Sequence, residues 1–126
     1  MTTAASNYLE NEVVDHLLGT GSWSAPAAVY VKLHTGDPGE DCTSNAAGET
    51  TRKAITFGAA VGGVATSNAD VDWTNVSTGE AYSHISIWDA SSGGNPLGYG
   101  ALSASVTVAA GDDFTLASGD VTVTFT

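Results

Sequence analysis

The sequence predicts a mainly β protein, in which an N-terminal amphipathic helix precedes a single antiparallel β-sandwich with a jelly-roll-like arrangement. Apolar residues recur at a helical step only near the start of the chain, whereas after residue 27 they alternate with polar ones. Glycine- and aspartate-rich turns separate the alternating runs. With 126 residues, the chain has the length of one domain. We expect a single domain over residues 1–126, with the helix in 1–20 and the sandwich in 27–126.

The expected helix has an apolar face with polar residues largely on its other side. That face consists of Ala5, Leu9, Val13 and Leu17, with Val14 and Leu18 beside them. Thr2 or Thr3 can cap the start of the helix. Gly19 and Gly21 supply the stop that helix C-termini commonly use. The helix should therefore end within LLGTG.

The first strand is expected in VYVKL, where Val29, Val31 and Leu33 share one face. Tyr30, Lys32 and His34 share the other. Further strands are expected in AITFGAA, VATSNADVDW, AYSHISIWDA, LGYGALSASVTVA, DFTLA and DVTVTFT. These make about eight strands, as in a sandwich or jelly roll. The last one, residues 121–126, is predicted either to pair inside the sheet or to form an edge for a neighbour.

The charge balance argues against nucleic acid as a partner. The chain has 3 Lys and Arg against 14 Asp and Glu, a net charge of −11. Its cations are Lys32, Arg52 and Lys53, too few for the basic stripe that phosphate binding needs. Strong negative charge favours docking onto a basic surface. No signal peptide or membrane-spanning run is evident, so we expect synthesis and assembly in a reducing cytoplasm without a membrane partner.

Paired carboxylates are the first candidates for a site. The acidic loop carries Asp37, Glu40, Asp41 and Glu49, but lacks the ordered spacing of a calcium loop. We expect a solvated turn or an intersubunit contact there, with a cation site as the weaker alternative. The pairs Asp70 with Asp72 and Asp112 with Asp113 lie among turn residues, so Asx-turns explain them better than glycosidase chemistry.

Histidine, cysteine and serine offer no better candidates. His16, His34 and His84 lack a local ligand spacing, although His16 suits the C-terminal end of a helix. Cys42 is alone, which excludes an intrachain disulfide and a thiolate zinc cage. No nucleophile elbow or phosphate loop is present. We therefore predict that the protein is not an enzyme and has no catalytic, cofactor-binding or metal-binding residues and no cofactor.

The aromatic residues are expected in the core or at a subunit interface, because most occupy alternating strand positions. They are Trp23, Trp73, Trp88, Tyr8, Tyr30, Tyr82, Tyr99, Phe57, Phe114 and Phe125. An alternative of another class is a glycan-binding module that stacks sugars on exposed rings near residues 73–99.

Four stretches spanning nearly the whole chain carry a family resemblance. They are YLENEVVDHLLGTGSW, VYVKLHTGDPGE, RKAITFGAA and the segment from ISIWDASSGGNP to the C-terminal VTVTFT. They resemble a family of small tailed-bacteriophage virion proteins, which carry the labels head decoration, minor capsid or tail-fibre-like. The resemblance implies a structural role in the virion and no catalytic residues.

Our first hypothesis from these observations is a capsid decoration or cement protein on the head surface. Its expected partners are the major capsid protein and further copies of itself, with a trimer as one possible oligomer. The alternative within the same class is a tail or tail-fibre-associated structural protein, whose partners are tail proteins.

Overall fold

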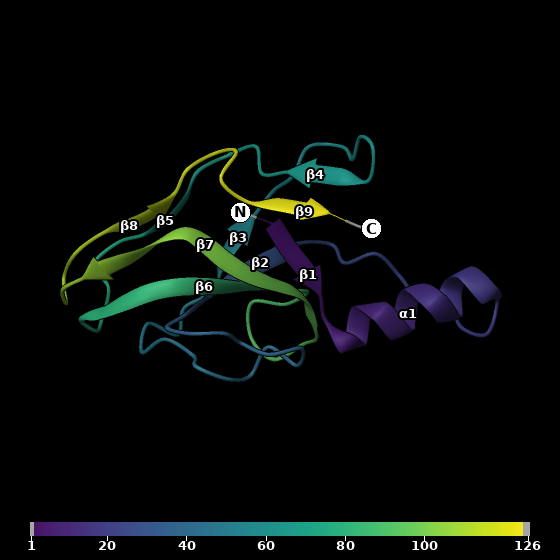
Figure 1. Cartoon of the computed structure of the whole chain (residues 1–126), viewed down its shortest axis with the longest axis horizontal. Coiled ribbons are helices and arrows are strands. Elements are labelled where there is room, and N and C mark those ends of the chain that lie inside the picture. Colours follow the sequence, from purple (N-terminus) through teal and green to yellow (C-terminus); the bar gives the residue numbers. More distant parts are fainter. Residues whose placement is uncertain (1, 125–126) are drawn as a thin grey trace.

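The computed structural model describes residues 2–124 and shows a curled β-sheet with an α-helix projecting from one end (Figure 1). The predicted mainly β, sandwich-like fold with a short N-terminal helix is confirmed. No helix in the described part is long and apolar enough to cross a membrane. The elements are β1 (Thr2–Ala5), α1 (Asn7–Leu18), β2 (Val29–His34), β3 (Lys53–Ile55), β4 (Val64–Thr66), β5 (Val71–Trp73), β6 (Glu80–Trp88), β7 (Pro96–Val108), β8 (Phe114–Leu116) and β9 (Thr122–Thr124).

Seven strands form the large sheet, in the spatial order β3-β2-β6-β7-β1-β9-β4, and β5 pairs with β8 in a separate ribbon. Neighbouring strands run antiparallel with one exception, the parallel pair of β1 and β9. Parallel strands need a long connection, which these two have because they lie near opposite ends of the chain. The sheet is therefore mixed at this one position, where the sequence predicted antiparallel pairing throughout.

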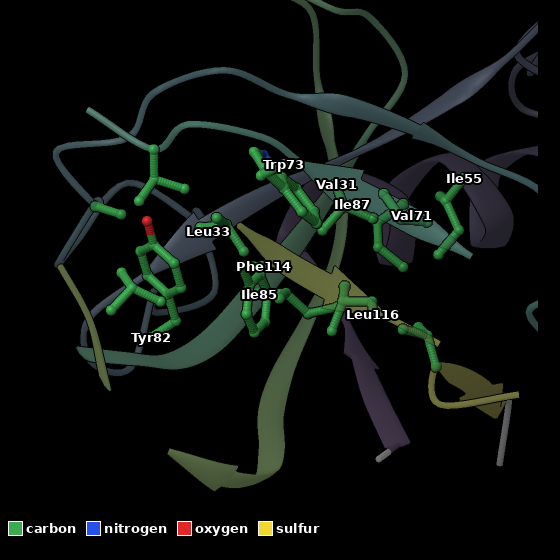
Figure 2. Packing of buried hydrophobic residues seen from close by; sticks show 14 residues of the cluster. Val31, Leu33, Ile55, Val71, Trp73, Tyr82, Ile85, Ile87, Phe114 and Leu116 are labelled. Atoms are coloured by element: carbon green, nitrogen blue, oxygen red, sulfur yellow. The ribbon is translucent and has the colours of Figure 1, made fainter. Parts of the chain in front are cut away.

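The core lies between the large sheet and the β5–β8 ribbon (Figure 2). Both ribbon strands alternate buried, exposed, buried, so one face of the ribbon points into the core. Phe114 of the ribbon contacts two other aromatic rings, with centroid distances of 5.7 Å to Trp73 and 5.1 Å to Tyr82. Leu33 and Ile85 from the sheet are fully buried in the same cluster. The two layers are thus joined mainly by aromatic and branched aliphatic packing.

The helix is shorter than predicted, because residues before Ser6 form a strand instead. Ser6 is the N-cap, and its hydroxyl accepts a hydrogen bond from the Leu9 N–H. The expected cap at Thr2 or Thr3 is therefore wrong; these residues pair with β9 instead. The expected stop at Gly19 is confirmed, since this residue adopts the left-handed conformation with φ 73°.

Two strand predictions also change in detail. The run VATSNADVDW divides into β4 and β5, which lie in different sheets, because a polar turn interrupts it: Asp70 accepts the Ser118 N–H. The C-terminal strand pairs inside the sheet, with β1 on one side and β4 on the other, which confirms the first of its two alternatives. Residues 125 and 126 of that predicted strand lie outside the described residues.

Candidate functional site

The carboxylates of the acidic loop bind backbone and side-chain donors at separate places. Asp37 accepts the Gly39 N–H at 2.9 Å in an Asx-type turn, Asp41 accepts from the side chain of Asn7, and Glu40 is exposed. Within residues 2–124, no group of three or more His, Cys, Asp or Glu side chains is arranged to hold a metal ion. The loop therefore supports turn structure, and its contact with a neighbour stays a prediction.

Glu49 is the member of this loop with a clear structural task. Its carboxylate accepts the Ser77 N–H at 2.9 Å and the Thr51 N–H at 3.2 Å. Burial acts to raise the pKa of Glu49, but the hydrogen bonds from Thr51 and Ser77 outweigh it and hold the pKa below its usual value. The ionised carboxylate thus fastens the end of the loop to the segment before β6.

The other paired aspartates do not face a common space. Asp112 accepts the Ala109 N–H and Asp113 accepts the Asn75 N–H, both at 2.9 Å. Asp70 accepts a backbone N–H, as described above, whereas Asp72 accepts the hydroxyl of Thr115 at 2.6 Å. Only Asp112 makes a local turn contact, three residues away, and even this is not the predicted Asx-turn. Asp70 and Asp113 instead bind backbone N–H groups of distant segments, and Asp72 joins the two ribbon strands.

A buried hydrogen-bond chain runs from Trp88 to the acidic loop. The Trp88 indole N–H donates to the Ser86 hydroxyl at 2.8 Å, and Ser86 lies 2.7 Å from His34 Nε2. His34 Nδ1 lies 2.9 Å from the carbonyl of Ser44, which can only accept, so Nδ1 carries the proton and Ser86 donates to Nε2. Burial lowers the pKa of His34, which favours this neutral imidazole.

The His34–Ser86 pair has the spacing of a base and a nucleophile, but its surroundings give it a structural role. Both residues have 0% of their surface exposed, so a substrate cannot reach the serine hydroxyl in this conformation. The face of β2 that carries Tyr30, Lys32 and His34 is therefore partly covered, because the acidic loop packs over His34. The other two histidines lie elsewhere: His84 contacts the Ser83 hydroxyl, and His16 accepts the Trp23 N–H near the end of α1.

Cys42 is buried against the sheet. Burial, with a smaller contribution from the neighbouring Asp41, raises the pKa of its thiol to about 12. Because the thiolate is the reactive form, this thiol is unreactive at neutral pH. Cys42 is thus a packing residue of the acidic loop.

A glycan-binding module would need exposed aromatic rings between residues 73 and 99, but most of the rings in this range are buried. Trp73 and Tyr82 belong to the core, with 1% and 0% of their surface exposed, and Trp88 is also buried. Tyr99 is half-buried. The expectation of exposed rings in this range is therefore wrong for the first three, because the core and a cation cover them.

That cation belongs to a surface cluster of Tyr30, Lys32, Arg52 and Trp88, which we call the cation patch. The Arg52 guanidinium carbon lies 4.0 Å from the centroid of the Trp88 ring, and the Lys32 ammonium lies 5.7 Å from it. Strand pairing explains the meeting: Tyr30 is opposite Trp88 on β6, and Lys32 lies on the same face of β2. Arg52 directly precedes β3, whose first residue pairs with Val31.

The two cations of the patch face neutral acceptors and one another. Arg52 Nη1 donates to the carbonyls of Ala90 at 2.9 Å and Gly93 at 2.7 Å. Burial lowers the pKa of Lys32, and the nearby Arg52 charge lowers it further. Burial also lowers the pKa of Arg52, while Asp89 acts to raise it. The sequence indicated too few cations for a basic stripe and gave no sign of this pair, which the β2–β3 register brings together.

A second open surface lies at the base of the helix. Here a groove of about 270 Å³ separates the first turn of α1 from the sheet. Its lining is apolar and includes Leu9, Trp23, Phe57, Leu97 and Val123. The groove joins the core at Ile87, so it is an open extension of the apolar interior.

Beyond the groove, α1 presents apolar side chains to solvent. None of its residues is buried. Leu17 is 79% exposed, Leu18 69% and Val14 51%. Helical spacing places Glu10 and Asp15 next to these three residues. We call the five residues the helix ridge.

Within residues 2–124, the polar clusters described above are hydrogen-bonded within the fold, whereas the helix ridge and the groove are open to solvent and the cation patch is partly exposed. This arrangement is typical of a structural protein that is covered by neighbours. The chain belongs to the family described as Podophage GP4 fiber I protein gp80, which matches residues 4–124. The resemblance to tailed-phage virion proteins is thereby confirmed, and the chain is a bacteriophage structural protein. A search of curated proteins gives no match.

Proposed function

We propose that the protein is a structural component of the tail-fibre apparatus of the virion. The observation that carries this proposal is the family match over residues 4–124, because that family is described as a fibre protein. Among the two virion locations that the sequence left open, the match favours the tail over the head. Capsid decoration, our first hypothesis from the sequence, becomes the alternative.

The chemistry of the molecule supports a non-enzymatic role. The nearest approach to a catalytic pair, His34 with Ser86, is buried and hydrogen-bonded at both ends. A fibre component instead needs surfaces for neighbours, and the helix ridge supplies apolar area that a single chain leaves exposed. The proposed partners are tail proteins and further copies of this chain, with no cofactor.

Immunogold labelling of intact virions tests the location directly. Antibodies raised against the purified protein are applied to whole particles, and the gold is located by electron microscopy. We expect gold on the fibres at the tail. Gold distributed over the head lattice would overturn the proposal in favour of decoration, and unlabelled particles would remove the protein from the virion surface. Virions of a phage that lacks this gene are the control for antibody specificity.

A further inference from the structure

The helix ridge requires a cover that is apolar and positively charged. A helix of 12 residues is marginal in water without tertiary packing, and α1 packs mainly beside β7 at its base. Its exposed side combines Val14, Leu17 and Leu18 with the carboxylates of Glu10 and Asp15. The helix contains no Lys or Arg. A surface that covered the ridge would therefore have to neutralise acids as well as bury aliphatic groups.

The cation patch requires a cover that is apolar and negatively charged. Lys32 and Arg52 lie over one indole ring, and the hydrogen bonds of Arg52 go to neutral carbonyls. Tyr30 adds a half-buried ring to the same face. All three cations of the chain lie in β2 or at the start of β3, against 14 acidic residues in the whole sequence. A surface that covered the patch would bring carboxylates and apolar groups together.

Each surface supplies what the other one needs, and within one chain they do not meet: α1 lies beside β7, and the patch lies on β2, β3 and β6 (Figure 1). We propose that the helix ridge of one copy docks on the cation patch of a second copy, in a head-to-tail contact. The warrant is charge complementarity, together with the exposed apolar side chains of the ridge and the half-buried Tyr30 ring of the patch. The inference rests on the proposed function, in which repeated copies form part of a fibre.

The two surfaces are different, so the contact is heterologous. Repetition gives a closed ring, such as a trimer, if the rotation between copies closes, and an open row if it does not. The net charge of −11 opposes association at long range, but at physiological ionic strength the screening length is about 8 Å. Screening therefore weakens the general repulsion more than it weakens the close charge pairs in the contact.

The test compares the full-length protein with two variants, each of which disables one surface. The helix variant combines Glu10→Lys with Leu17→Ser, and the patch variant is Lys32→Glu, since Arg52 has additional structural contacts. Sedimentation velocity over a range of concentrations measures association. We expect the original protein to form oligomers and each variant to associate at least about tenfold more weakly, because a reversed charge opposes its partner.

Mixing the two variants is the decisive step. The helix variant keeps an intact patch and the patch variant keeps an intact ridge, so an equimolar mixture should form dimers at concentrations at which neither variant associates alone. Val61→Ser, which alters an 80% exposed valine outside both surfaces, should associate as the original does. Circular dichroism confirms that each variant folds, and Lys32→Gln replaces Lys32→Glu if the latter does not.

Several results would overturn the inference. The original protein could remain monomeric at all concentrations, or the mixture could contain no dimer. If only the helix variant lost association, the ridge would dock on a surface other than the cation patch. The apolar groove is the nearest candidate for that surface. A chain that is monomeric in solution but labelled on the virion tail would refute this contact and leave the proposed function intact.

Discussion

The β5–β8 ribbon and helix α1 are both short elements beside the large sheet, yet they are built in opposite ways. The ribbon directs Val71, Trp73, Phe114 and Leu116 into the core, each at most 6% exposed. The helix buries none of its 12 residues. Packing within one chain thus explains why the ribbon has apolar residues, but it hardly explains those of the helix. The difference teaches that this sequence places apolar residues in two settings: in the core in one region, and on the surface in the other, where we propose contact with neighbours.

The largest effect should come from removing the Phe114 ring, which the ribbon packs against Trp73 and Tyr82. Phe114→Ala leaves a cavity beside Trp73 and Tyr82 and should lower the free energy of unfolding by about 3–5 kcal/mol. Urea denaturation followed by tryptophan fluorescence measures this loss. Leu17→Ala on the helix ridge is the matched control and should change stability by less than about 0.5 kcal/mol in the monomer. Equal effects at the two sites would contradict the comparison.

A second substitution tests how the strand that leads into the helix is attached. Gly98 on β7 lies opposite Ala5, and a Cβ atom at this position would lie 2.7 Å from the Ala4 carbonyl oxygen. Gly98→Ala should therefore push β1 from the sheet and cost about 1–3 kcal/mol. Gly58→Ala is the control, because its nearest neighbour lies at an ordinary 3.9 Å. Thermal unfolding of both variants gives the ranking, which would be wrong if Gly58→Ala cost more.

The loop contact at Glu49 should give a smaller, pH-dependent effect. Because the folded-state pKa lies below its usual value, the stabilisation is complete above the unfolded pKa of about 4.3 and disappears as the pH falls through the folded pKa. Glu49→Gln should cost about 1–2 kcal/mol at pH 7 and progressively less below pH ~4. Urea titrations of both proteins at several pH values measure the difference, and a constant difference would exclude this linkage.

The smallest effect concerns an imperfection of the core. The Tyr82 hydroxyl is buried and has no hydrogen-bond partner among the described residues. Burial raises the pKa of Tyr82, so the neutral form is kept. Tyr82→Phe removes the unsatisfied group and should leave stability unchanged or increase it by up to about 1 kcal/mol. A loss of more than that amount in a urea titration would indicate that the hydroxyl is satisfied in solution.

Local patterns predicted most elements but not how distant elements meet. The alternation in VYVKL correctly placed Val31 and Leu33 in the core, and Gly19 correctly marked the helix end. The strand before Ser6 was missed because TTAA has no period, and only its partners β7 and β9 make it a strand. Tertiary pairing overrides weak local preference in such segments.

The candidate surfaces show the same division. The sequence correctly indicated a local turn at Asp112, but the long-range backbone contacts of Asp70 and Asp113 could not be read from it. The cation patch depends on the register of β2 with β3 and β6, which the sequence does not state. The exposure of Leu17 could not be foreseen either, because an amphipathic pattern is the same whether its apolar face meets its own core or another molecule.

The position of β1 in the sheet also determines when its pairing can be completed during synthesis. Strand β1 lies between β7 and β9, and its β9 neighbour is synthesised more than 110 residues later. Contacts this distant in sequence are slow to form because a long loop must close first. Until residues 122–124 emerge from the ribosome, at least one edge of β1 stays unpaired and can pair with a strand of another chain. Correct folding therefore depends on β9 pairing with β1 before a competing strand does.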